Sequence, residues 1–265
     1  MRKIVALNCA TVAIGLVASV PAMATNLFSD NFESGVSSST WALVNAGQSL
    51  LDGDTGGHHM GTQSAKQVNA FTNGVSDVYY MKTQSTAFTN PGPIAAGYKE
   101  VATVQFWDEN IRTDQSGDSA IDIRGALMLA GSYSSTDFYQ LGVNSSVSVN
   151  NYFWRTQAQG SFATSVARTQ GWHELRIEVL PYTGSNDVQF YIDNLNVASG
   201  NRRAAGAVDM NEIRLGISIR TPDSPFWFDN VSLAMVPEPV SISLLGLGSL
   251  VLVGFAGRRR RAPIA

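Results

Sequence analysis

Apolar and polar residues alternate repeatedly between positions 25 and 235. At 172–179, which reads WHELRIEV, the side chains of Trp, Glu, Arg and Glu fall on one face of an extended chain, and those of His, Leu, Ile and Val fall on the other. This period of two is typical of a β-strand with one buried face. The same alternation predicts strands at 188–192, 213–219 and 226–233.

Turn-forming residues separate the alternating segments. The sequence TGSND occupies 183–187, and Asp193 and Asn194 lie between two predicted strands. Gly, Asn and Asp adopt the backbone conformations that tight turns require. Around a dozen short strands and no long helical pattern predict one all-β domain at 25–235, folded as a two-sheet antiparallel sandwich. The remaining expected strands lie at 78–82, 100–107, 119–123, 126–129 and 138–143.

The first 24 residues have the features of an export signal. Arg2 and Lys3 precede an apolar segment at 4–20, and the sequence AMA at 22–24 forms a small-x-small cleavage site. We expect a signal helix within residues 1–24 and cleavage after Ala24. An uncleaved membrane anchor is the alternative.

A second apolar segment lies near the C-terminus. Residues 240–257 carry no charge, and about 18 such residues form a helix of roughly 27 Å, just long enough to cross a bilayer core. A block of positive charge should stay on the cytoplasmic side of the membrane. We expect a transmembrane helix with an exported body, and a buried core helix is the alternative. The charged block consists of Arg258, Arg259, Arg260 and Arg261.

The sequence VPEP, formed by Val236, Pro237, Glu238 and Pro239, precedes the expected membrane helix. Its two prolines hold the chain extended and exclude a helix. Followed by an apolar span and an arginine cluster, this arrangement at 236–262 resembles the PEP-CTERM sorting signal of Gram-negative bacteria. The resemblance implies that 236–265 is a sorting signal recognised at VPEP by an exosortase-type membrane protease. It also implies removal of the span and delivery to the cell surface or extracellular matrix.

Composition and charge agree with export. Only 15% of the residues are charged, and the single cysteine, Cys9, lies within the expected signal. The mature chain would therefore have no disulfide and no cysteine metal ligand. Without the two terminal segments, 12 Lys and Arg accompany 20 Asp and Glu, a net charge of about −8. This charge argues against nucleic acid or an anionic membrane surface as a partner.

Several strand sequences of the body resemble those of a known fold group. The segments GWHELRI at 171–177, VQFYID at 188–193 and FWFDNV at 226–231 resemble strands of the concanavalin A-like, laminin-G-like jelly roll, and 28–35 matches its opening strand. The resemblance implies a jelly roll whose first and last strands pair. A galactose-binding-like jelly roll is the alternative fold. These motifs are structural and specify no ligand.

The body has no recognisable catalytic motif. A sandwich glycosidase needs two carboxylates that face one cleft, and glucanases of this fold carry them on a Glu-x-Asp-x-x-Glu strand. The closest match, at 174–178, has Arg176 in place of the middle carboxylate. We interpret Glu174 and Glu178 as solvated partners of Arg176. We therefore expect a non-catalytic protein, and a glycan hydrolase or lyase with an unrecognised active site is the alternative.

A structural calcium ion is a candidate where the first and last strands meet. Asp30 or Glu33 should lie near Asp229 there, and carboxylate oxygens are ligands that calcium prefers. A turn-capping role for Asp229 is the alternative. The segment DGDTGGHHMG at 52–61 is interpreted as a flexible surface loop, because adjacent histidines on an extended chain point opposite ways.

Tyr152, Trp154 and Arg155 are the candidate ligand-binding residues, as an exposed patch. Core packing of the aromatic residues is the alternative. Together these observations predict an exported, surface-sorted, non-catalytic β-sandwich protein. Its expected role is to bind or structure polysaccharide in the extracellular or biofilm matrix.

Overall fold

A computed structural model of the chain describes residues 23–43, 51–67, 81–83, 94–111, 124–131, 137–203, 210–216 and 226–238. All of them belong to one compact unit, residues 23–238. Residues 1–22 of the expected signal, the expected membrane helix at 240–257 and the arginine block lie outside the described residues. Within the described ranges, no helix is long and apolar enough to cross a membrane.

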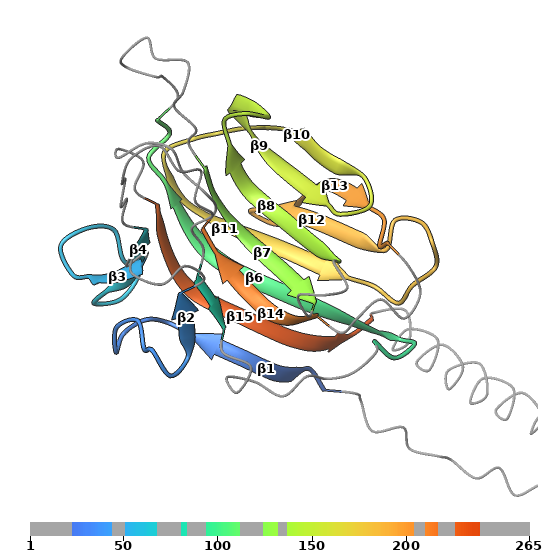
Figure 1. The fold of residues 1–265 in the computed structure, drawn as a ribbon, viewed down its shortest axis with the longest axis horizontal. Helices are drawn as coiled ribbons and strands as arrows, with labels where there is room; N and C mark the ends of the chain where they lie inside the picture. Colours follow the sequence, from blue (N-terminus) through green and yellow to red (C-terminus); the bar gives the residue numbers. More distant parts are fainter. Residues whose placement is uncertain are drawn as a thin grey trace, which may run out of the picture. The chain divides into compact units, whose positions relative to one another are not determined.

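Fifteen β-strands form the described part of the chain, in two antiparallel sheets that we call sheet A and sheet B (Figure 1). Sheet A has the order β13-β12-β11-β6-β15-β4-β3, with β1 also paired to β15. Its strands are β1 (Thr25–Asp30), β3 (Leu51–Asp54), β4 (Ser64–Gln67), β6 (Tyr98–Asp108), β11 (Gly171–Val179), β12 (Val188–Ile192), β13 (Leu195–Gly200) and β15 (Trp227–Pro237).

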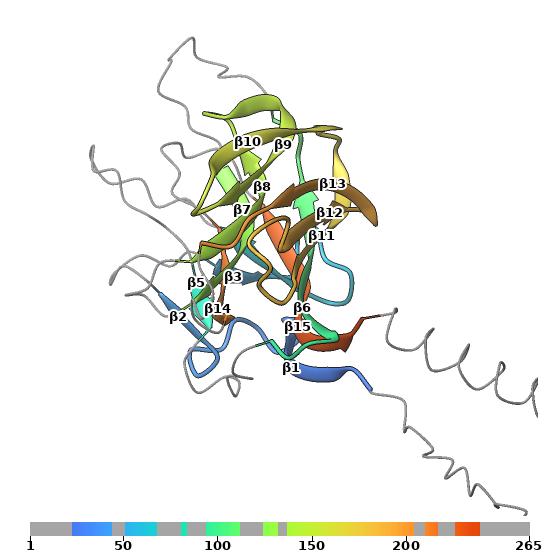
Figure 2. The same ribbon diagram turned by 90° about the vertical axis from the view of Figure 1, so that its right-hand side faces the viewer.

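Sheet B has the order β10-β9-β8-β7-β14-β5-β2. Figure 2 shows β7, β8 and β14 in one layer and β6, β11 and β15 in the other. The expected two-sheet antiparallel sandwich is therefore confirmed for the described residues. The strands of sheet B are β2 (Trp41–Leu43), β5 (Met81–Thr83), β7 (Arg124–Gly131), β8 (Phe138–Asn144), β9 (Ser148–Thr156), β10 (Gly160–Ala167) and β14 (Met210–Leu215).

The core lies between the two sheets and is built by alternate residues of each strand. On β6, Ala102, Val104 and Phe106 are fully buried, and their cross-strand partners on β11 include Leu175 and Ile177. The residues between them face the opposite side of sheet A and are half-buried. This arrangement confirms the two faces that the alternation at 172–179 predicts.

The turn between β12 and β13 is formed by Asp193 and Asn194, which have φ angles of 49° and 66°. Two successive residues with positive φ are the signature of a type I′ turn, whose twist suits a hairpin. Asn and Asp tolerate this conformation better than other non-glycine residues. The hairpin turn expected at these two positions is therefore confirmed.

Strand β15 joins both ends of the domain. A β-bulge follows Asp229, and Asn230 there has a φ of 47°. Before the bulge β15 pairs with β4, and after it β15 pairs with β1, from Val231 opposite Asp30 to Met235 opposite Thr25. The expected pairing of the first and last strands is confirmed.

The last strand runs further than the sequence pattern indicates. Val236 and Pro237, the first half of the VPEP sequence, pair with Lys99 and Tyr98 of β6. The backbone N–H of Glu238 donates to the carbonyl of Gly97 at 2.8 Å. Successive N–H groups of a strand point to opposite sides. The nitrogen of Pro237 therefore faces away from β6, and the lack of an N–H there costs no hydrogen bond to that strand. Half of the expected recognition peptide is thus part of the sheet.

Candidate functional site

The three candidate ligand-binding residues of β9 do not form an exposed patch. Tyr152 is fully buried in the core, and burial raises the pKa of its hydroxyl. Trp154 is half-buried and packs against Phe190, with ring centroids 5.3 Å apart. Arg155 lies on the other face of sheet B, with its guanidinium 4.8 Å from the ring centroid of Phe138. The prediction of one exposed patch is wrong because successive residues of a strand point to opposite faces.

Of the three candidate calcium ligands, Asp30 has both carboxylate oxygens in hydrogen bonds to its own neighbourhood. One of its carboxylate oxygens accepts a hydrogen bond from the indole N–H of Trp41 at 2.7 Å, and the other accepts one from the backbone N–H of Phe32 at 2.8 Å. Both oxygens therefore hold the turn that follows β1. The described residues contain no cluster of three or more His, Cys, Asp or Glu side chains arranged to hold a metal ion.

Glu33 and Asp229 lie against the same short loop. Glu33 accepts hydrogen bonds from the hydroxyl and the backbone N–H of Thr62, which lower its pKa. Asp229 accepts one from the backbone N–H of Met60 at 2.9 Å and one from that of Asn230 at 2.7 Å. Burial raises the pKa of Asp229, and the negative charge of Glu33 adds to the shift. Of the expected calcium ligands, the fold thus brings Glu33 and Asp229 near each other, and their negative charges repel.

A row of three tryptophans crosses the outward face of sheet A. Trp172 of β11 lies directly opposite Trp107 of β6, which lies opposite Trp227 of β15. The rings of Trp107 and Trp172 meet edge to face, with centroids 5.7 Å apart. Trp107 and Trp172 are half-buried, whereas Trp227 is buried. Strands lie about 4.8 Å apart, so the row extends over about 10 Å. We call this side of sheet A the tryptophan face.

The segment DGDTGGHHMG at 52–61 packs on the tryptophan face. The ring of His58 stacks on Trp107 with centroids 3.7 Å apart, and it meets Trp227 edge to face at 4.7 Å. Its Nε2 lies 2.8 Å from a carboxylate oxygen of Glu109. The histidine pair expected in a flexible surface loop therefore contributes one ring, that of His58, which covers the centre and one end of the row.

Polar side chains continue the tryptophan face beside the row. Glu174 lies opposite Gln105, and Arg176 lies opposite Tyr191. The guanidinium of Arg176 is 4.3 Å from the ring centroid of Tyr191 and donates to the side-chain oxygen of Asn194 at 2.8 Å. Aromatic rings and hydrogen-bonding groups therefore share one accessible surface.

Two carboxylates of the tryptophan face are paired with cations, whereas Asp229, which lies opposite Gln105 on the same face, accepts hydrogen bonds from backbone N–H groups. Lys99 lies 2.6 Å from Glu178, and Arg176 lies 3.3 Å from both Glu174 and Glu178. This confirms the expected pairing of the two glutamates with Arg176. The expectation that both are solvated is wrong for Glu178, which is buried.

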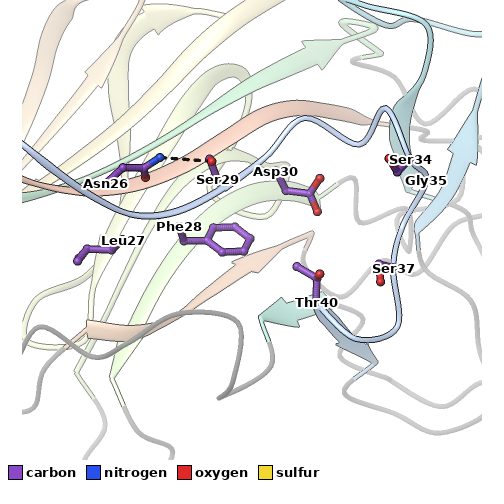
Figure 3. Close-up of a pocket in the computed structure, with 9 residues that line it drawn as sticks. All are labelled: Asn26, Leu27, Phe28, Ser29, Asp30, Ser34, Gly35, Ser37 and Thr40. Carbon is purple, nitrogen blue, oxygen red and sulfur yellow. Dashed lines mark hydrogen bonds between the residues drawn. The ribbon is translucent and has the colours of Figure 1, made fainter.

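A shallow hollow of about 460 Å³ lies along β1 and the turn that follows it (Figure 3). It is lined mainly by small polar side chains, among which Asn26 donates to the hydroxyl of Ser29 at 3.3 Å. Its one carboxylate, Asp30, is occupied by the two hydrogen bonds described above. The hollow therefore offers little chemistry for a ligand.

The residues of the expected sorting signal are only partly described. Val236, Pro237 and Glu238 lie at the end of β15 and just beyond it, and all three are half-buried. Pro239 and the arginine block lie outside the described residues.

No protein-family model and no curated protein sequence matches this chain. Among solved structures, the endo-1,3-β-glucanase of Streptomyces sioyaensis is similar, with a TM-score of 0.50 and 15% identity over 83% of this chain and 99% of that one. A carbohydrate esterase of the Shiga toxin-encoding bacteriophage phi24B has a TM-score of 0.46 and 14% identity, over 81% and 100% of the two chains. The globular domain of T. cruzi calreticulin has a TM-score of 0.47 and 12% identity, over 88% and 95%.

These identities are too low to carry over an activity. The likeness to the glucanase establishes what the sheet order also indicates, a two-layer antiparallel β-sandwich.

Proposed function

We propose that the protein is an exported, surface-sorted, non-catalytic member of the concanavalin A-like jelly rolls that binds or structures extracellular polysaccharide. The observation that carries the proposal is the tryptophan face. A sugar ring presents C–H groups on its faces and hydroxyls at its rim. Half-buried indoles beside hydrogen-bonding side chains complement both, since an indole contributes a large apolar surface and fixed geometry.

The two sequence signals support the proposed location. An N-terminal export signal and the VPEP, apolar and arginine segments favour transient anchoring in the inner membrane of a Gram-negative bacterium. An exosortase-type protease is the proposed partner that releases the body to the cell surface or matrix. The net charge of about −8 of the body disfavours nucleic acid as a partner.

The pairing of charges supports binding without catalysis. A general acid or nucleophile of a glycosidase must face the scissile bond with a second carboxylate opposite. Glu174 and Glu178 instead share Arg176 between them. Glu174, whose side chain is 30% exposed, can still accept hydrogen bonds from sugar hydroxyls.

The test combines a binding assay with a turnover assay on the purified full-length protein, kept in a detergent that has no sugar head group. Polysaccharides immobilised in a gel should retard the protein, and no new reducing ends or unsaturated sugars should form during long incubation. Release of such products would contradict the non-catalytic proposal. Failure of every polysaccharide to retard the protein would contradict binding.

A further inference from the structure

The ion pairs of the tryptophan face disfavour binding of a negatively charged sugar. A uronate carboxylate that bound Arg176 would bring a third negative charge beside Glu174 and Glu178, which lie 3.3 Å from Arg176. Glu178 is only 8% exposed at its side chain, so water screens the repulsion between these charges poorly. Like charges brought together at a poorly solvated site oppose binding.

Two further cations lie on this surface: Lys99 is ion-paired in the same way, and Lys66 lies over Trp227 with its Nζ 5.1 Å from the ring centroid. Lys99 is 19% exposed at its side chain and lies 2.6 Å from Glu178. A polyanion that drew Lys99 away would leave Glu178 with Arg176 alone. The negative charge of the whole body adds a long-range repulsion against any acidic polymer.

Trp172 is the half-buried ring of the row on which, among the described residues, no other ring stacks face to face. His58 occupies a face of Trp107 and the edge of Trp227, and Trp227 is only 5% exposed. Trp172 has no such cover among the described aromatic contacts, in which Trp107 is its one neighbour. A sugar ring can therefore stack on Trp172 and meet Trp107 at its side.

From these contacts we infer that the ligand of the tryptophan face is an uncharged polysaccharide, stacked on Trp172 with its hydroxyls directed at Gln105, Glu174 and Arg176. The inference rests on the proposed glycan-binding function and specifies its ligand class. An ion-paired carboxylate still accepts hydrogen bonds and an ion-paired guanidinium still donates them. The pairs therefore serve neutral hydroxyls without being broken.

The experiment measures the affinity of the purified full-length protein, in sugar-free detergent, by isothermal titration. The probes are laminarin and galactomannan, which are uncharged, and polygalacturonate and alginate, which are acidic. Each is titrated at about 0.1 M and about 1 M salt, where the screening length falls from about 10 Å to about 3 Å. We expect binding to an uncharged probe that changes by less than about twofold with salt, since no net charge is neutralised on binding.

Trp172→Ala should weaken this binding by about tenfold or more, which corresponds to about 1.4 kcal/mol. Trp172→Phe keeps an apolar ring, so its affinity should fall between that of the native chain and that of Trp172→Ala. This milder variant guards against a loss of binding that is caused only by misfolding. Phe162→Ala is the matched control, because Phe162 is 45% exposed on β10 of sheet B and stacks on Trp154. It should bind as the native chain does.

The outcomes separate the inference from the function on which it rests. Binding of the acidic probes alone, weakened at high salt, overturns the uncharged ligand and leaves glycan binding intact. Binding that is lost in Phe162→Ala and retained in both Trp172 variants overturns the location. Absence of binding to all four probes counts against the proposed function itself.

Discussion

Glu33 and Asp229 show how local partners determine the chemistry of a residue. Both carboxylates lie against the loop that contains Met60 and Thr62. Two donors from Thr62 lower the pKa of Glu33, while burial raises that of Asp229. A carboxylate with a lowered pKa remains charged at neutral pH, and it opposes ionisation of its buried neighbour.

The raised pKa of Asp229 predicts a pH dependence of stability. An unfolded Asp ionises near pH 3.9, whereas folded Asp229 holds its proton to a higher pH. Its favourable contribution is complete below about pH 3.9 and is lost as pH rises through the folded pKa. With a calcium chelator present, the free energy of unfolding of the native chain should therefore fall, relative to that of Asp229→Asn, as the pH rises from about 3.9 through the folded pKa of Asp229. Urea unfolding at several pH values measures the difference, and parallel pH profiles would show that Asp229 is not responsible.

Calcium should act on the same pair of residues. A cation between Glu33 and Asp229 would remove their repulsion, and binding to the folded state alone raises the melting temperature. We expect this rise for the native chain and for Asp30→Asn, since the oxygens of Asp30 are occupied by Trp41 and Phe32. Asp229→Asn and Glu33→Gln should abolish it. Identical melting curves of the native chain in calcium and in chelator would remove the ion from this account.

Strand periodicity predicts faces well and pairing poorly. The alternation at 172–179 places Trp172 and Arg176 on one side without knowledge of the fold. That Trp172 meets Trp107 and Trp227 depends on the register of strands far apart in the sequence, for which a single sequence carries no signal. The same period of two places Arg155 on the opposite face from Tyr152 and Trp154, so the sequence alone argues against one patch of all three.

The end of β15 supports a prediction about its proline. The nitrogen of Pro237 faces away from β6, whereas that of Val236 faces it. Pro237→Ala should therefore change the free energy of unfolding by less than about 0.5 kcal/mol. Val236→Pro should lower it by about 1 kcal/mol or more through the lost hydrogen bond. Denaturant unfolding of both variants decides the matter, and equal effects would contradict the assigned register.

At the scale of the molecule, sequence and structure inform different parts of the chain. The fold of the body was predictable because alternation, turns and composition all favour a sandwich. The two terminal signals are recognised from sequence, and their helices lie outside the described residues. The structure adds that the sandwich continues into the first half of VPEP.

Processing of the sorting signal is a prediction about the whole chain in its own cell. Protein recovered from the cell surface should begin at Thr25 and should lack Arg258 to Arg261, because both terminal segments are expected to be removed. Mass spectrometry of peptides from the surface fraction and from the inner membrane provides the comparison. A surface form that retains the arginines would rule out C-terminal processing.

The most direct test of glycan binding on the tryptophan face is a nuclear magnetic resonance titration that follows the indole N–H signals of the five tryptophans. With an uncharged polysaccharide, the signals of Trp172 and Trp107 should shift progressively. The signals of Trp41, which is buried, and Trp154, which packs against Phe190, should stay in place. Shifts confined to Trp154 or Trp41, or no shift at any of the five, would contradict the account.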